Sequence, residues 1–149
     1  MKNLLLLLLF VAFTVSVSAQ RINPVSWKYE AKKISSTSYQ LIITATVQQP
    51  WHIYSQTTGE GPVPTKFEFK KNPLVTLTGN VAEKGNLQNV YDPNFKSQVK
   101  YFSNSVVFIQ NIKLKTKVKT NISGTVEYMI CNDEQCLPPV KKTFTIAIE

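Results

Sequence analysis

Short runs in which apolar and polar residues alternate recur along most of this chain. Residues 25–31 place Val25, Trp27, Tyr29 and Ala31 on one side. Alternating or β-branched runs follow at 39–47, 52–54, 66–69, 74–81, 99–102, 105–114, 120–130 and 144–148. A period of two is typical of a strand with one buried face, and no segment beyond the first twenty residues shows a capped 3.6-residue period. The pattern predicts an all-β domain.

The expected strands number eight or nine, and turn residues separate them every 8 to 15 positions. This rhythm favours an immunoglobulin-like antiparallel β-sandwich, with a barrel as the second choice. Within 105–114 the alternation is expected to slip near Gln110. Three stretches interrupt the strands and are expected to be loops: 56–64, 84–96 and 131–139. Loops on a rigid scaffold often carry function.

The first nineteen residues have the composition of a secretory signal peptide. Lys2 precedes an apolar run with six consecutive leucines, and small residues at Val17-Ser18-Ala19 offer a cleavage site. The run is short for a membrane span. We therefore expect a signal peptide at 1–19 and one exported domain at 20–149 with no further membrane span.

The chain is basic, with a formal net charge of +8, of which Lys2 in the leader contributes one. The cationic residues are scattered along the expected strands rather than clustered in one motif. Scattered lysines on strands usually form solvated faces and protect sheet edges. We therefore expect no nucleic-acid partner.

Two cysteines, Cys131 and Cys136, flank one of the expected loops. In an oxidising compartment they are close enough to pair. Such a small ring stabilises a fold by only about 2 kcal/mol, which a domain with this much apolar sequence hardly needs. A structural staple and a redox-active pair both remain open. Asp133 and Glu134 within the ring disfavour thiolate formation, which fits a dithiol that gives electrons away.

Metal chemistry is less well supported by the residues present. Zinc needs three or four ligands, and the only histidine, His52, is distant in sequence from the cysteines. We interpret His52 as a half-buried aromatic residue. A copper(I) carrier would need more sulfur ligands than the cysteine pair and Met129. We expect no metal and no cofactor.

Three motifs, in order, resemble the periplasmic N-terminal domain of the thiol:disulfide interchange protein DsbD. They are Trp51-His-Ile-Tyr54 on a short strand, Tyr91-Asp-Pro-Asn-Phe95 in a polar stretch, and Cys131-Asn-Asp-Glu-Gln-Cys136-Leu-Pro-Pro139. The resemblance covers nearly the whole chain after the leader. It implies an immunoglobulin-like fold, a periplasmic location, and electron transfer by dithiol–disulfide exchange as a protein-disulfide reductase component.

The resemblance also implies roles for individual residues. Cys136 would form the mixed disulfide with a partner, and Cys131 would resolve it. Tyr54 would lie beside the pair and tune it by hydrogen bonding, together with the charges of Asp133 and Glu134. Phe95, with Tyr91 as the second choice, would cover the disulfide from a cap loop that also holds Asp92.

The resemblance further implies two kinds of partner protein. Because the chain ends at Glu149, we expect a separate membrane-embedded thiol reductase as electron donor. Thioredoxin-like or disulfide-isomerase proteins of the periplasm would accept the electrons. The alternative is an immunoglobulin-like binding module whose disulfide is purely structural.

Overall fold

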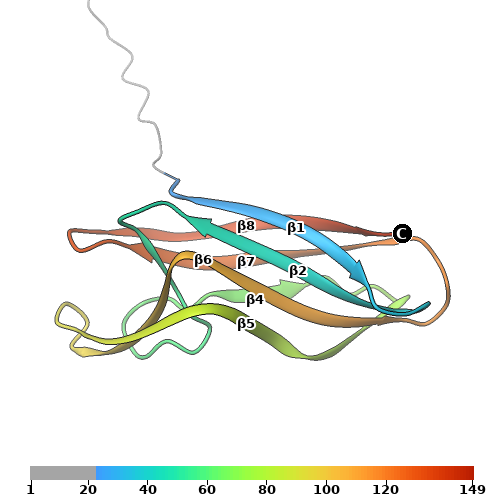
Figure 1. The fold of residues 1–149 in the computed structure, drawn as a ribbon, viewed down its shortest axis with the longest axis horizontal. Coiled ribbons are helices and arrows are strands. Elements are labelled where there is room, and N and C mark those ends of the chain that lie inside the picture. Colours follow the sequence, from blue (N-terminus) through green and yellow to red (C-terminus); the bar gives the residue numbers. More distant parts are fainter. Residues whose placement is uncertain (1–22) are drawn as a thin grey trace, which may run out of the picture.

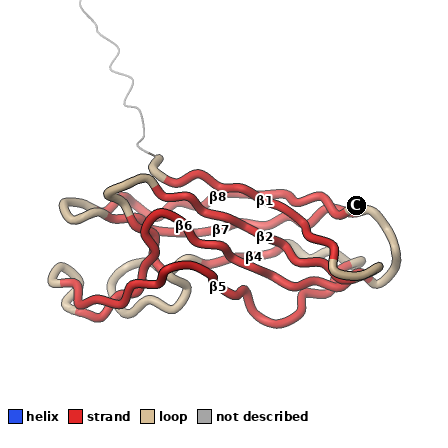
Figure 2. The backbone as a smooth tube through the Cα atoms, viewed as in Figure 1, coloured by secondary structure: helices blue, strands red, loops and turns tan. Residues whose placement is uncertain are grey.

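The structure, a computed structural model, describes residues 23–149 and consists of antiparallel strands joined by turns (Figures 1 and 2). The expected signal peptide lies outside the described residues. The strands are β1 (Val25–Lys33), β2 (Ser38–Val47), β3 (His52–Tyr54), β4 (Lys66–Phe69), β5 (Val75–Asp92), β6 (Ser97–Leu114), β7 (Thr120–Cys131) and β8 (Cys136–Ile148). No helix in this part of the chain is long and apolar enough to cross a membrane.

One continuous, curled sheet forms both layers of the sandwich. Its main path runs β1-β2-β6-β3-β7-β4, with β5 added to β6 and β8 added to β7. Strand β6 pairs with β3 through residues 101–103 and with β2 through residues 105–113. Between these two pairings Asn104 adopts a positive φ of 66°. The bend there lets β6 take part in both pairings.

Apolar side chains from both halves of the sheet meet in one core. Trp27 of β1 lies 5.1 Å from Tyr128 of β7 and 6.1 Å from Phe108 of β6, measured between ring centroids. Gly124 lies against this core, where a Cβ would come within 2.6 Å of the Phe144 ring. The expected all-β sandwich is confirmed, and the core residues are those on the alternating faces of the expected strands.

The stretch 84–96 was expected to be a loop, and this prediction was wrong for most of it. Strand β5 continues to Asp92 and pairs with β6 throughout, with irregularities at Thr78/Ala82 and Gly85/Leu87. Most of its side chains are exposed, so burial imposes no alternation on them. The slip in alternation expected near Gln110 is not found either. Gln110 points into the protein like its neighbours Phe108 and Ile112, because its buried side-chain amide donates to the carbonyl oxygens of Thr78 and Gly79 at 3.1 and 3.3 Å.

The stretch 131–139 was expected to be a loop, but only its central residues form a turn. Strand β8 begins at Cys136 and contains Pro138 and Pro139, which lie at a register shift opposite Met129. Proline lacks the amide hydrogen that a regular ladder needs, and it is tolerated at bulges and on edge strands. The bulge therefore accommodates the two prolines within the strand.

Candidate functional site

A disulfide between Cys131 and Cys136 joins the end of β7 to the start of β8 at one end of the sandwich. The two residues are directly paired across the hairpin, with Cα atoms 4.0 Å apart. Asn132 shapes the turn between them, because its Oδ1 accepts hydrogen bonds from the amides of Glu134 and Gln135 at 3.0 and 2.8 Å. In Figure 1 this turn lies at the same end of the molecule as the turn between β5 and β6.

The two cysteines differ sharply in exposure. Cys131 is only 2% exposed, whereas Cys136 is exposed at the edge of the hairpin. An attacking thiolate must reach a sulfur atom along the axis of the disulfide bond, so access decides which sulfur is attacked. The difference in exposure therefore favours the sulfur of Cys136 as the one that a partner can reach.

The buried cysteine belongs to a small apolar cluster separate from the main core. It contains Cys131, Tyr54 and Val99, with Phe95, Tyr101 and Met129 packed around them. Strand β3 places these residues together: Ile53 pairs with Ile130 of β7 and faces the main core, so its neighbours His52 and Tyr54 point to the opposite face. We call the group formed by Cys131, Tyr54 and Val99 the second cluster.

His52 is the direct partner of Cys131 across strands β3 and β7. Its ring stacks on Tyr101 with centroids 4.1 Å apart, and its Nε2 lies 3.3 Å from the hydroxyl oxygen of Tyr54. Tyr54 is fully buried, and burial raises its pKa, with a further contribution from the nearby Asp92 carboxylate. The tyrosine is therefore a neutral hydrogen-bonding group whose partner is the histidine.

Acid is expected to destabilise the fold through His52. Burial lowers the pKa of His52, and the carboxylates of Asp133 and Asp92 offset only part of this effect. The unfolded chain then binds the proton on His52 more tightly than the folded protein does. The contribution of His52 to the free energy of unfolding is therefore fully present above about pH 6.5 and is lost as pH drops toward the pKa of His52 in the folded protein. The slope is at most about 1.4 kcal/mol per pH unit.

Urea unfolding of the protein between about pH 7.5 and pH 5 measures this slope, in a window above the ordinary carboxylate range. His52→Gln keeps a neutral hydrogen-bonding side chain and is expected to flatten the profile. Equal slopes in both proteins would show that His52 does not cause the effect.

A tight turn at residues 93–96 carries Phe95 onto the second cluster. The Oδ1 of Asp92 accepts hydrogen bonds from the amides of Asn94 and Phe95 at 2.8 and 3.4 Å, which fixes the turn. The Phe95 ring meets Tyr54 edge to face, with centroids 6.2 Å apart. Tyr91, by contrast, is 60% exposed. Of the two expected cap aromatics, Phe95 is therefore the one that covers the buried side of the site.

The loop 56–64, correctly expected from its glycines and prolines, supports this turn from outside. Gly61 has a φ of +110°, and a Cβ there would lie 2.5 Å from Cδ1 of Phe95. The hydroxyl of Ser97 donates to the carbonyl oxygen of Glu60, and the amide of Val63 points at the Met129 sulfur at 3.4 Å. Phe95 is thus held between the second cluster and a glycine backbone.

A shallow hollow of about 280 Å³ separates the 93–96 turn from the disulfide turn. Asp92 lies on one side and Asp133 on the other, with His52 between them, and Glu134 is exposed beyond the rim. This end of the protein therefore offers a concave, acidic surface beside the turn that joins the two cysteines. The lining residues are His52, Val90, Tyr91, Asp92, Pro93, Asn94, Tyr101, Asn132 and Asp133.

Comparison with known protein families shows the family to which the chain belongs. The family described as thiol:disulfide interchange protein DsbD, N-terminal, matches residues 19–148. The chain belongs to this family. The resemblance inferred from the three motifs is confirmed, and the chain carries a cysteine pair in disulfide-bonded form. No curated protein sequence matches the chain.

Solved structures agree on the DsbD N-terminal fold. The N-terminal periplasmic domain of ScsB from Proteus mirabilis has a TM-score of 0.55 at 13% identity, covering 83% of this chain and 44% of that one. The chain thus spans less than half of the ScsB structure. The reduced DsbD N-terminal domain of Neisseria meningitidis has a TM-score of 0.54 at 13% identity, covering 81% of this chain and 84% of that one.

A third structure holds the DsbD N-terminal domain of Neisseria meningitidis in complex with the N-terminal domain of PilB. Its TM-score is 0.53 at 14% identity, with 85% of this chain and 87% of that chain covered. At such low identity these likenesses establish the fold, and they confirm the expected immunoglobulin-like sandwich.

The structure brings most of the sequence-predicted site residues to one end of the sandwich. Tyr54 and Phe95 pack with Cys131, Asp92 fixes the cap turn, and Asp133 lies on the hollow. Sequence reasoning missed the contact of His52 with this site, and also the support that Gly61 gives to Phe95. Only the position of His52, two residues before Tyr54 in the same motif, pointed to it.

Proposed function

We propose that this DsbD N-terminal domain carries electrons by reversible exchange between the Cys131–Cys136 disulfide and the thiols of partner proteins, with Cys136 as the sulfur that meets the partner. The observation that carries the proposal is the contrast between an exposed Cys136 and a buried Cys131 beneath an aromatic cap. A structural staple does not need a cap, or a cysteine presented beside an acidic hollow.

The proposed exchange starts from the reduced domain. The Cys136 thiolate attacks one sulfur of an oxidised partner, a sulfur–sulfur bond forms between the proteins, and the partner's other sulfur leaves as a thiolate. The Cys131 thiolate then attacks the Cys136 sulfur, which restores the Cys131–Cys136 bond and releases the partner as a dithiol. Two electrons pass to the partner, and the partner takes up the two protons that the domain's thiols lose. The reverse sequence recharges the domain.

The partners in this proposal follow from the chemistry of the site and from the family. A DsbD N-terminal domain of Neisseria meningitidis forms a complex with a PilB domain. For this chain we infer periplasmic thioredoxin-like or disulfide-isomerase acceptors and a membrane-embedded thiol reductase as donor. The acidic hollow beside the disulfide turn would favour acceptors with a neutral or basic rim around their own disulfide.

A redox titration of residues 20–149 in glutathione or dithiothreitol buffers tests the proposal. A carrier is expected to have a reduction potential above about −300 mV, whereas structural disulfides of secreted proteins lie below that value. A potential in the structural range, with partner binding that survives replacement of both cysteines by serine, would instead support a binding module.

Neutralising the acidic turn is expected to make the reduced pair more reactive. The carboxylates of Asp133 and Glu134 stand in the turn between the cysteines, and negative charge opposes thiolate formation. Asp133→Asn/Glu134→Gln should lower the pKa of the more acidic thiol by about half to one pH unit. Thiolate ultraviolet absorbance against pH measures the midpoint. Glu30→Gln/Glu68→Gln, which removes two exposed charges on β1 and β4 outside the site, is the matched control. An unchanged or higher midpoint in the double variant would contradict the charge argument.

A further inference from the structure

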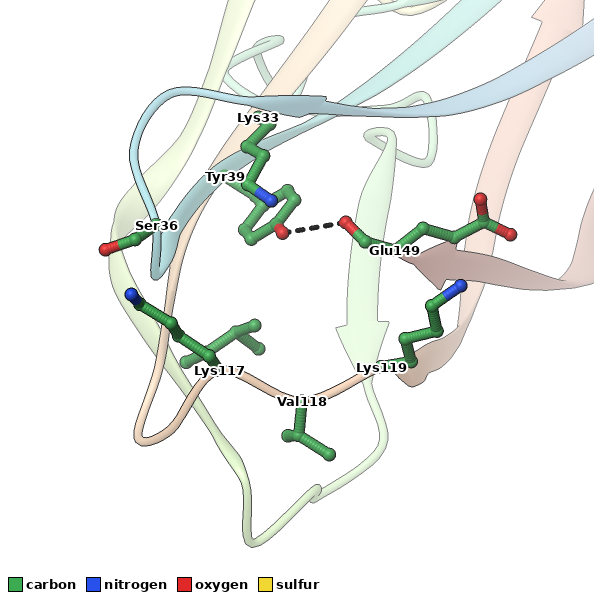
Figure 3. Close-up of a pocket in the computed structure, with 8 residues that line it drawn as sticks. Lys33, Ser36, Tyr39, Lys117, Val118, Lys119 and Glu149 are labelled. Atoms are coloured by element: carbon green, nitrogen blue, oxygen red, sulfur yellow. Dashed lines mark hydrogen bonds between the residues drawn. The ribbon is translucent and has the colours of Figure 1, made fainter.

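Eight exposed lysines gather at the end of the sandwich opposite the disulfide. They flank the 34–37 turn between β1 and β2, the loop between β4 and β5, and the loop between β6 and β7. We call this surface the lysine end, and its lysines are Lys32, Lys33, Lys70, Lys71, Lys113, Lys115, Lys117 and Lys119. Figure 3 shows Lys33, Lys117 and Lys119 around a hollow of about 320 Å³.

Hydrogen bonds tie the three loops into one surface. The amide of Leu114 donates to the carbonyl oxygen of Thr37 at 2.7 Å, and the amide of Lys115 donates to that of Leu74 at 3.0 Å. The Asn72 side chain donates to the Thr120 hydroxyl at 3.1 Å. Within the hollow the Tyr39 hydroxyl donates to the backbone oxygen of Glu149 at 2.8 Å (Figure 3). The lysines are therefore presented on a preformed platform.

The positive charge of the lysine end is not neutralised within the described part of the chain. The ion pairs among residues 23–149 use Lys28, Lys66 and Lys141, none of which belongs to this surface. Glu149 is the acidic residue that lines the hollow. Asp92, Asp133 and Glu134 lie at the opposite end, so the long axis of the domain carries a charge gradient.

Exposed apolar side chains stand among these lysines. Ile34 is 55% exposed, Leu74 38%, Leu77 45% and Val118 40%. They come from separate loops and strand ends, and Val118 lies between Lys117 and Lys119. Protein interfaces have a contiguous apolar centre and are depleted in lysine. Isolated apolar tips among lysines suit a lipid interface, where lysine heads reach phosphates while the tips enter the headgroup layer.

We propose that the lysine end docks on a membrane surface rich in anionic phospholipid. Strand β7 runs from this end to Cys131, and twelve strand residues span about 35 to 40 Å. Docking in this way directs the disulfide away from the lipid and toward soluble partners. The charge gradient favours the same orientation, because the acidic end is repelled by an anionic surface. The proposal does not depend on the exchange chemistry of the cysteines.

Co-sedimentation of residues 20–149, which contain every strand of the sandwich and lack the apolar leader, tests this docking. The probe is vesicles of equal parts phosphatidylglycerol and phosphatidylcholine, compared with phosphatidylcholine alone. We expect binding only to the anionic vesicles at about 20 mM salt and much weaker binding at about 500 mM salt. Changing four lysines of the surface to glutamine is expected to weaken binding at least tenfold. The four are Lys33, Lys115, Lys117 and Lys119.

The matched control removes the same charge elsewhere, by changing Lys84, Lys96, Lys100 and Lys142 to glutamine, and is expected to keep most of the binding. A second pair of variants tests the apolar side chains. Leu74→Ser/Val118→Ser is expected to bind the anionic vesicles several-fold more weakly, whereas Val140→Ser on β8 is expected to keep the binding. Equal losses in the two lysine variants would reduce the effect to net charge and overturn the proposal, as would absence of binding to the anionic vesicles. An unchanged unfolding midpoint confirms that each variant is folded.

Discussion

A Cys131→Ser protein is expected to accumulate as a mixed disulfide with an oxidised thiol partner, whereas a Cys136→Ser protein is not. In the first variant the exposed sulfur remains and the resolving thiol is gone, so the intermediate has no internal route to release. In the second, the remaining thiol is 2% exposed beneath Tyr54 and Phe95. We expect it to react roughly 100-fold more slowly, the factor imposed by a local opening that costs about 3 kcal/mol.

Glutathione disulfide serves as the probe, and mass spectrometry of quenched samples counts the adducts over time. The comparison has an internal control, because both variants should react at similar rates once unfolded in urea. Equal rates in the folded proteins would show that burial does not select the attacking sulfur. Faster reaction of Cys131 would reverse the proposed roles of the two cysteines.

The alternation of apolar and polar residues predicted the strands that bury one face. It did not reveal the strand in which neither face is buried. Residues 25–31 and 39–47 show the period of two because every second side chain enters the core. Strand β5 pairs with β6 along most of its length, yet most of its side chains are exposed. Because neither face of such a strand is buried, its apolar and polar residues need not alternate. Residues 84–92 therefore looked like a loop in the sequence.

Prolines misled the prediction at the start of β8 for a related reason. Pro138 and Pro139 indicate a break when read locally, but they form a bulge within β8, opposite Met129 of β7. Whether a proline ends a strand depends on the register of the neighbouring strand. That register is a property of the folded sheet and is not visible in the local sequence.

The cysteine pair and the nearby Tyr54 and Phe95 could be predicted from the sequence and the family resemblance, whereas the place of His52 could not. The pairing of Cys131 and Cys136 follows from their short separation between two strands, and their order of attack came from the family resemblance. The contact between His52 and Cys131 arises because β3 is inserted between β6 and β7. Seventy-nine positions separate these residues in the chain, and no local pattern records that β3 bridges the two halves of the sheet.

Truncating the cap is expected to expose the Cys131 side of the disulfide to small thiols. The Phe95 ring packs on the second cluster from one side and on the Gly61 backbone from the other. Phe95→Ala removes the ring but leaves the Asp92 hydrogen bonds that shape the turn, since these go to backbone amides. We expect the rate of reduction by dithiothreitol to rise by roughly tenfold, which corresponds to about 1.4 kcal/mol of lost protection.

Tyr91→Ala is the matched control, because this aromatic side chain lies on the same hairpin but is 60% exposed. It should leave the rate unchanged, and Phe95→Leu should fall between the two, since leucine keeps part of the covering volume. The equilibrium potential of each variant separates kinetic shielding from a change in disulfide stability. A cap that only shields raises the rates of reduction and reoxidation together and leaves the potential fixed. A higher rate with a shifted potential would mean that Phe95 acts on the redox equilibrium, and an unchanged rate would remove its covering role.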